Sequence, residues 1–157
     1  MTLTPFLKPQ LTFFYPRVDD TDHLYQLMAK DLMEQGIVSR PDSIKRLFIR
    51  RESLHSTAIG GGVATPHIYS PEFREFIVPI ARVAEPVPFE TPDDLPVHLV
   101  FFIVSDDRDV PLHLKTLSRI SRMTLDHSWY PEVLNAASPE KLVQMISQRD
   151  QNLAETP

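Results

Sequence analysis

Three consecutive glycines, Gly60–Gly62, restrict the folding of this chain most, because its 157 residues contain only four glycines. Glycine accepts positive φ and lets another segment or a ligand approach the backbone closely. Shortly afterwards, Pro66 fixes its own φ and favours an extended conformation at Thr65. A neutral imidazole is a nucleophile, and its proton is exchanged near neutral pH. We therefore predict a strand–turn–strand unit with a stiff end that presents His67 as a reactive side chain.

The composition is that of one globular domain spanning residues 1–157, with 42% hydrophobic and 24% charged residues. A net charge of -5 makes nucleic acid an unexpected partner. The absence of cysteine excludes disulfides, zinc–thiolate sites and thiol catalysis. No apolar run is long enough to cross a bilayer, and the first residues do not follow the pattern of a signal peptide. We expect a cytoplasmic protein that is not inserted in a membrane.

Helix caps and apolar spacing predict alternating helices and strands. A first helix should begin at one of the N-cap candidates Asp20, Thr21 and Asp22 and end near Gly36, and a second should begin near Pro41 and carry Arg50–Glu52 at its end. The remaining predicted elements are a short strand at 11–15, strands at 77–84 and 97–104, a helix capped by Asp109, a helix near 131–137, and a last helix from Pro139 to Gln148 with frayed residues beyond it. This mixture indicates an α/β domain in which helices pack on a sheet.

A second histidine, His113, falls in the first turn of the helix that Pro111 opens. Free backbone N–H groups and the helix dipole favour an anion at such a position. If the strand at 97–104 lies beside the strand that carries His67, both histidines reach the same edge of the sheet. Arg51 precedes the glycine turn and is expected to fold back over it. Two imidazoles, a guanidinium and a helix N-terminus would form a small pocket for a dianion.

Each of these features also has a structural interpretation. Arg51 could be a solvated helix cap with Glu52 as its ion-pair partner. Gly60–Gly62 could be a plain hairpin turn, since its spacing fits neither a dinucleotide fingerprint nor a P-loop. Asp106–Asp109 reads as a solvated loop rather than a metal site. Structural or surface roles are expected for a further set of residues: His23, His55, His98, His127, Ser56 and Thr57.

Read together, the residues of 51–67 closely resemble the signature of the type 2 EIIA domain. This is the mannitol/fructose class of the bacterial phosphoenolpyruvate-dependent phosphotransferase system. The matching residues are Arg51-Glu52, Leu54, Ser56-Thr57, Ile59-Gly60, Gly62-Val63-Ala64 and Pro66-His67, followed later by His113-Leu114, Leu117-Ser118 and Ile120. The opening helix with Gly36-Ile37-Val38 and the turn Ala137-Ser138-Pro139-Glu140 are also similar to that family, so the resemblance covers nearly the whole chain.

The resemblance implies a mixed sheet with helices on both faces. It implies that His67 is phosphorylated on its solvent-facing ring nitrogen, that His113 is the second active-site histidine, and that Arg51 lies beside them. It further implies a phosphotransferase that accepts a phosphoryl group from the carrier protein HPr and passes it to a sugar-transporting EIIB unit, without cofactor or metal. Since two proteins must reach His67 in turn, we expect it at an open rim with a modest apolar patch.

Two other functions remain open at this point. A nitrogen-regulatory EIIA resembles the same family but regulates other proteins through its phosphorylation state. A metal hydrolase would use His67, His113 and an aspartate, although no third ligand stands at the usual spacing. Three departures from the family pattern, Ala58, Thr65 and Ile68, favour a sugar-specific or divergent member, and a bulky Ile68 would narrow access to His67.

Overall fold

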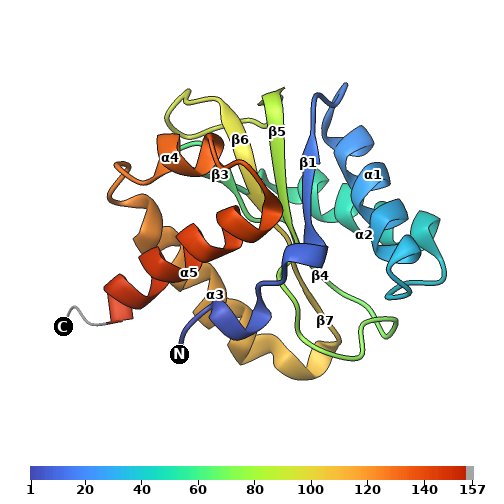
Figure 1. Ribbon diagram of the computed structural model, residues 1–157. Coiled ribbons are helices and arrows are strands. Elements are labelled where there is room, and N and C mark those ends of the chain that lie inside the picture. Colours follow the sequence, from blue (N-terminus) through green and yellow to red (C-terminus); the bar gives the residue numbers. More distant parts are fainter. Residues whose placement is uncertain (155–157) are drawn as a thin grey trace.

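The computed structural model describes residues 1–154 of the chain. A mixed β-sheet forms the middle layer, and helices cover both of its faces (Figure 1). One face carries α1 (Thr21–Glu34) and α2 (Pro41–Leu54), and the other carries α3 (Val110–Thr124), α4 (Tyr130–Leu134) and α5 (Pro139–Ala154). This arrangement confirms the expected α/β class with helices on both sides of the sheet.

The central sheet contains five strands in the order β1-β5-β6-β3-β2. β5 pairs antiparallel with β6 and β2 pairs antiparallel with β3, whereas the β1–β5 and β3–β6 pairs are parallel. A separate pair of parallel strands is formed by β4 and β7. The strand bounds are Thr12–Tyr15 (β1), Ala58–Gly60 (β2), Val63–Ala64 (β3), His67–Tyr69 (β4), Ile80–Val87 (β5), Val97–Phe101 (β6) and Ile103–Ser105 (β7).

The small sheet exists because two strands are interrupted and continue beyond the break. Pro66 has no N–H to donate and separates β3 from β4. Phe102 separates β6 from β7, since its N–H donates to the Pro79 carbonyl at 2.8 Å. The predicted single strand at 97–104 is therefore two strands, and His67 begins a strand instead of ending one.

The break also places neighbouring aromatic side chains in opposite halves of the core. Phe102 packs with Tyr25 and Phe48 under α1 and α2, and the ring centroids of Phe48 and Phe102 are 5.3 Å apart. Phe101 belongs to the apolar cluster under α3 and α5, together with Ile120. The sheet is thus buried on both faces, as the nearly continuous apolar run at 97–104 indicates.

Most helix boundaries follow the predicted caps. Asp20 accepts a hydrogen bond from the His23 N–H, Gly36 follows α1 with φ of +76°, and α2 begins at Pro41. Asp109 is an exception, because its side chain makes no capping bond. Asp106 instead caps the short 3-10 turn η3 (Asp107–Asp109) ahead of α3.

Other boundaries are shifted. β5 begins three residues later than predicted, and Ile77 forms only an isolated bridge to Val104. Two 3-10 turns, η1 (Thr4–Phe6) and η2 (Pro9–Leu11), precede β1. α4 ends at Leu134, earlier than expected, and α5 continues to Ala154, well past Gln148. The predicted fraying of the last residues concerns 155–157, which lie outside the described residues.

A buried carboxylate ties three distant segments together. The Asp150 side chain has no exposed surface and accepts a hydrogen bond from the Leu3 N–H at 2.6 Å. It also pairs with Arg119 Nε, while Arg119 Nη2 donates to the Asp150 carbonyl at 2.7 Å. The N-terminal segment, α3 and α5 are therefore joined at one point. None of the helices within residues 1–154 has both the length and the apolar character needed to cross a membrane.

Candidate functional site

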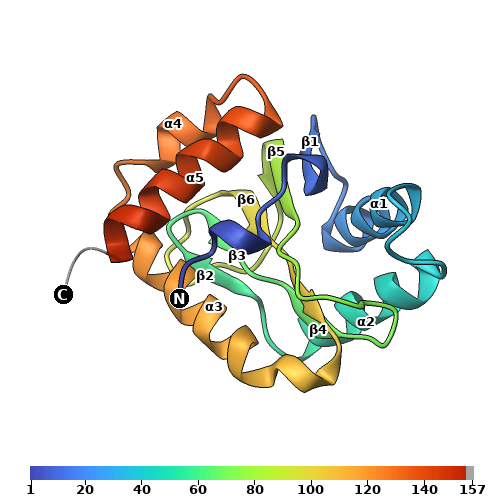
Figure 2. The same cartoon turned by 60° about the horizontal axis from the view of Figure 1, so that its bottom comes forward.

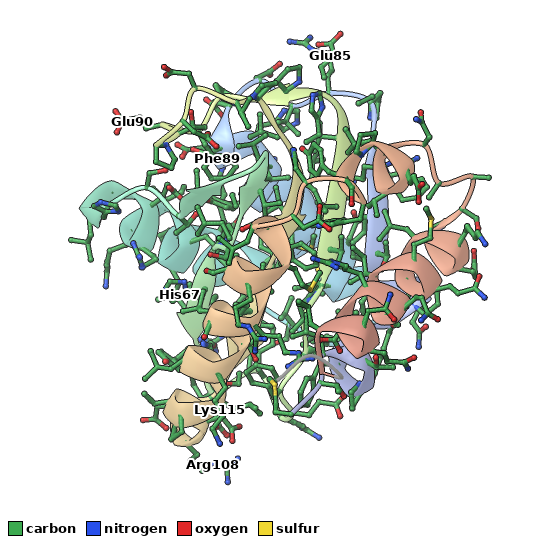
Figure 3. All side chains as sticks on the ribbon, turned by 90° about the vertical axis from the view of Figure 1, so that its left-hand side faces the viewer. His67, Glu85, Phe89, Glu90, Arg108 and Lys115 are labelled. Carbon is green, nitrogen blue, oxygen red and sulfur yellow. The ribbon has the colours of Figure 1, made fainter. Side chains whose placement is uncertain are left out.

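Arg51, His67 and His113 come from three elements that meet at β4. Arg51 lies in the last turn of α2, His67 is the first residue of β4, and His113 lies in the first turn of α3. Figure 2 shows β4 between α2 and α3, and Figure 3 shows His67 beside α3. Arg51 Nε lies 3.3 Å from His67 Nε2, and His67 acts electrostatically on His113. Arg51 and His67 are therefore in contact, and His113 packs on Tyr69, two residues along β4 from His67.

The hydrogen bonds of His67 define its tautomer. Its Nδ1 lies 3.0 Å from the Thr65 carbonyl oxygen, which can only accept, so Nδ1 carries the proton. Nε2 then holds a lone pair and accepts a hydrogen bond from Arg51 Nε. Pro66 between Thr65 and His67 stiffens this short loop. The local backbone thus fixes which ring nitrogen is nucleophilic.

The same surroundings keep His67 neutral. Partial burial lowers its pKa below the ordinary 6.5, and the charge of Arg51 lowers it further. The hydrogen bond to the Thr65 carbonyl and the charge of Glu52 act in the opposite direction but do not cancel the shift. At neutral pH Nε2 is therefore unprotonated, which a nucleophile requires.

The side chain of His113 is buried. Its side chain is only 1% exposed, because the Tyr69 ring packs on it at 4.2 Å between centroids and Phe76 meets it edge-on at 5.3 Å. Its Nε2 lies 2.7 Å from Ser105 Oγ. Burial, followed by the influence of His67, lowers its pKa to about 4. His113 therefore lies beneath Tyr69 and is uncharged at neutral pH.

The glycine turn is not part of this site. Gly60, Gly61 and Gly62 all have positive φ, at +93°, +63° and +78°. The Gly61 N–H donates to Asp93 Oδ2 at 2.8 Å, and the Gly62 carbonyl accepts from the Tyr130 hydroxyl at 2.7 Å. These glycines accommodate the loop before β6 and the start of α4, so the structural interpretation holds.

Arg51 does not fold over the glycine turn, contrary to the expectation. Its Nη1 donates to the His55 carbonyl at 2.9 Å, and its Nε is directed at His67. The carbonyl at the end of α2 therefore holds one arm of the guanidinium and orients the other. Arg51 is a helix cap and a neighbour of His67 at the same time.

Glu52 is the positioning residue that the sequence interpretation missed. Instead of pairing with Arg51, its carboxylate accepts hydrogen bonds from the Tyr25 hydroxyl at 2.5 Å, the Thr57 N–H at 2.8 Å and the Thr57 hydroxyl at 2.7 Å. These bonds fix the junction between α2 and β2. The signal was present in the sequence, because Glu52 follows Ile44 and Phe48 at helical spacing and so lies on the buried stripe of α2.

The departures from the family pattern lie away from the reactive nitrogen. Ile68 is 5% exposed and belongs to the core cluster under α1 and α2, so it does not narrow access to His67. The Thr65 side chain is buried, and its backbone carbonyl is the group that contacts the ring. Ala58 packs against the same core cluster.

The remaining histidines and turn residues have structural partners. His98 donates from Nδ1 to the Val83 carbonyl, and His127 packs on Tyr130. The Ser56 hydroxyl donates to the Glu90 carbonyl, as expected of a turn residue. These contacts account for these side chains without a role in chemistry.

The aspartate-rich turn offers no metal site. Asp106 pairs with Arg108, which lowers the pKa of its carboxyl group. Within residues 1–154, no three His, Cys, Asp or Glu side chains are grouped so that they could hold a metal ion. The geometry therefore gives the metal-hydrolase alternative no support.

A neutral imidazole beside a guanidinium, on an α/β scaffold, is an arrangement suited to accepting an anionic group. The chain matches the family model described as "Phosphoenolpyruvate-dependent sugar phosphotransferase system, EIIA 2" over residues 5–149. It belongs to this family of type 2 EIIA components, whose members take part in phosphoryl transfer. The resemblance carried by the sequence motifs is thereby confirmed.

Two of the relatives that the chain resembles carry different descriptions. The chain is 28% identical over 131 residues to the fructose-specific EIIABC component of Bacillus subtilis, which covers 83% of this chain but only 21% of that relative. It is 32% identical over 127 residues to a nitrogen regulatory protein of Bradyrhizobium diazoefficiens, covering 80% of this chain and 82% of that relative. The chain thus spans about a fifth of the fructose-specific relative's length.

Solved structures share the fold. The nitrogen regulatory protein IIA-Ntr of Neisseria meningitidis superposes with a TM-score of 0.81 at 24% identity, covering 91% of this chain and 97% of that one. The mannitol IIA of Escherichia coli gives 0.74 at 18% identity, covering 89% and 98%. A further similar structure is the complex of E. coli IIA mannitol with phosphorylated IIB mannitol. Its TM-score is 0.71 at 18% identity, and the match covers 90% of this chain and 97% of that one.

Proposed function

We propose that this chain is a phosphocarrier in which His67 Nε2 accepts a phosphoryl group from phospho-HPr and passes it to an EIIB unit for sugar uptake. The observation that carries the proposal is the hydrogen bond from His67 Nδ1–H to the Thr65 carbonyl. It leaves the Nε2 lone pair directed to the side where Arg51 lies. We take residues 1–157 as one EIIA domain located in the cytoplasm.

The transfer is a displacement at phosphorus. The Nε2 lone pair of His67 forms the new N–P bond as the N–P bond of the donor phosphohistidine breaks, and the donor imidazole leaves with that electron pair. The Nδ1 proton stays on His67, where the Thr65 carbonyl stabilises the positive charge that develops on the ring. No proton has to be removed from the nucleophile, because the resting ring is neutral.

Arg51 has two roles in this step. In the resting state its Nε occupies the Nε2 lone pair at 3.3 Å, so the guanidinium must turn aside before attack. It can then pair with the equatorial phosphoryl oxygens, where charge accumulates. A fixed positive charge supplies this stabilisation without a metal ion.

The surface around the site suits transient partners. Leu54 at the end of α2 is 77% exposed, and on α3 Leu114 is 63% and Val110 43% exposed. We infer that these exposed apolar side chains, on the two helices that flank β4, contribute to a modest patch of the kind used in short-lived complexes. HPr and an EIIB unit would use this patch in turn.

The direct experiment is phosphorylation by phospho-HPr followed by intact-mass measurement. We expect His67→Ala to gain no phosphoryl group, whereas the control His55→Ala, which removes an exposed histidine from the end of α2, gains one like the natural chain. Arg51→Ala should slow the gain without a matching fall in melting temperature. Undiminished phosphorylation of His67→Ala would refute the proposal.

A nitrogen-regulatory role is the second candidate, and two observations favour it. The nitrogen regulatory relative is 32% identical over most of both chains. In addition, Ile68 lies in the core, which removes one reason for preferring the sugar-specific class. Transfer to a panel of EIIB domains decides between the two. A sugar-specific carrier transfers to at least one of them, whereas a regulatory protein retains its phosphoryl group with all.

A further inference from the structure

Two hydrogen bonds of Ser105, at the end of β7, set the tautomer of His113. Ser105 Oγ lies 2.8 Å from the Asp106 carbonyl oxygen and 2.7 Å from His113 Nε2. The carbonyl can only accept, so the single hydroxyl proton of Ser105 is directed to Asp106 and Oγ accepts from His113 Nε2–H. The ring is neutral at neutral pH and carries one proton. Its Nδ1 therefore holds a lone pair.

That Nδ1 atom has no partner. Within residues 1–154 it is one of the few buried side-chain nitrogen or oxygen atoms without a hydrogen bond. Buried polar atoms are nearly always paired, because leaving one unpaired destabilises the fold. The ring lies against Tyr69, which shares a face of β4 with His67 two residues earlier. The unpaired atom thus belongs to a side chain that packs on Tyr69, the neighbour of His67 on this face of β4, and that is influenced electrostatically by His67.

A phosphoryl group on His67 would conflict with this tautomer. Its oxygens are hydrogen-bond acceptors, and a lone pair on His113 Nδ1 would repel them. The ring can bind them only as Nδ1–H, and in the neutral ring, which its low pKa favours, this leaves Nε2 as an acceptor that requires a donor. The Ser105 hydroxyl becomes that donor when it rotates away from the Asp106 carbonyl.

We propose that Ser105 is a positioning residue whose hydroxyl reverses direction when His67 is phosphorylated, converting His113 from an acceptor into a donor toward the phosphoryl oxygens. This inference rests on the proposed function of His67. One proton leaves His113 Nε2 and one binds Nδ1, both by exchange with solvent, so the charge and the proton count of the pair are unchanged. Apart from these two N–H bonds, no covalent bond is made or broken at His113 or Ser105.

The tautomer of His113 can be read directly by long-range ¹H–¹⁵N NMR on chain labelled with ¹⁵N-histidine. We expect protonated Nε2 before phosphorylation and protonated Nδ1 after it, with intact mass reporting the extent of phosphorylation. An unchanged tautomer in fully phosphorylated chain overturns the inference and leaves the role of His67 intact. A chain that gains no phosphoryl group refutes the proposed function and this inference with it.

Variants separate tautomer control from packing. Ser105→Ala should show mixed His113 tautomers and accept the phosphoryl group about tenfold more slowly, as expected for one lost hydrogen bond in the transition state. Ser105→Thr, which keeps the hydroxyl, should restore a single tautomer. Thr116→Val is the matched control, because it removes another buried hydroxyl one turn further along α3 that has no partner. Equal slowing in Ser105→Ala and Thr116→Val, or a natural tautomer in Ser105→Ala, overturns the inference.

Discussion

Replacing Gly62 by alanine should destabilise the fold while leaving the chemistry of His67 intact. A Cβ at Gly62 would lie 2.5 Å from Tyr130 Cζ and closer still to its hydroxyl oxygen. The positive φ of +78° adds about 1–2 kcal/mol for an alanine in the left-handed region. Displacing Tyr130 then disrupts its hydrogen bonds to the Gly62 carbonyl and from the His98 N–H, at about 1 kcal/mol each.

The matched control is Gly36→Ala. Gly36 has nearly the same φ, +76°, but nothing lies within 4 Å of the position of an added Cβ. It should show the backbone effect alone, about 1–2 kcal/mol. The total for Gly62→Ala is about 3–4 kcal/mol, because the loss of the two Tyr130 hydrogen bonds adds to the backbone effect. The two variants should therefore differ by about 2 kcal/mol in the free energy of unfolding, the contribution of the two hydrogen bonds.

Urea unfolding followed by tryptophan fluorescence measures this difference. Trp129 is the only tryptophan and directly precedes Tyr130, so its emission reports on the displaced region. Equal losses in Gly62→Ala and Gly36→Ala would refute the steric argument. Loss of phosphoryl acceptance in folded Gly62→Ala would show that the glycine turn contributes to the site after all.

Three further predictions concern a buried ion pair and two histidines whose pKa is lowered. Arg51→Met should move the acid limb of phosphoryl acceptance to higher pH, because the Arg51 charge helps to lower the pKa of His67, and the pH profile of the acceptance rate measures this. Asp150→Asn should lower the free energy of unfolding by about 3 kcal/mol, because it leaves Arg119 buried without its charged partner, and urea titration checks this. The natural chain should lose stability as pH falls from 6.5 toward 4, because unfolded His113 binds a proton that the folded ring does not. The loss is at most about 1.4 kcal/mol per pH unit, and thermal melts across this range should show a smaller slope for His113→Phe.

The sequence predicted the helices well because their ends carry local signals. Pro41 at the start of α2 and Gly36 after α1 act through their own backbone preferences, which do not depend on the rest of the fold. The strand interruption at Phe102 carries no such signal. Phe102 is apolar like its neighbours, and only its hydrogen bond to the Pro79 carbonyl separates β6 from β7.

In the candidate site, too, some features are visible in the local sequence and others arise only from the packing of distant segments. Pro66-His67 and Arg51 stand out in the sequence, and the structure places their side chains in contact. The burial of His113 beneath Tyr69 depends on how α3 packs on β4, a contact between segments 44 residues apart that no local pattern encodes. The glycine run misled the interpretation because glycine signals a close approach without identifying the partner, which here is Tyr130.

The central claim is that His67 Nε2 carries the phosphoryl group, and ³¹P–¹⁵N correlation NMR on phosphorylated, ¹⁵N-histidine-labelled chain tests it most directly. The hydrogen bond from Nδ1–H to the Thr65 carbonyl predicts a phosphorus coupling to His67 Nε2, with Nδ1 still protonated. Coupling to Nδ1 of His67, or to a nitrogen of any other histidine, would contradict the account.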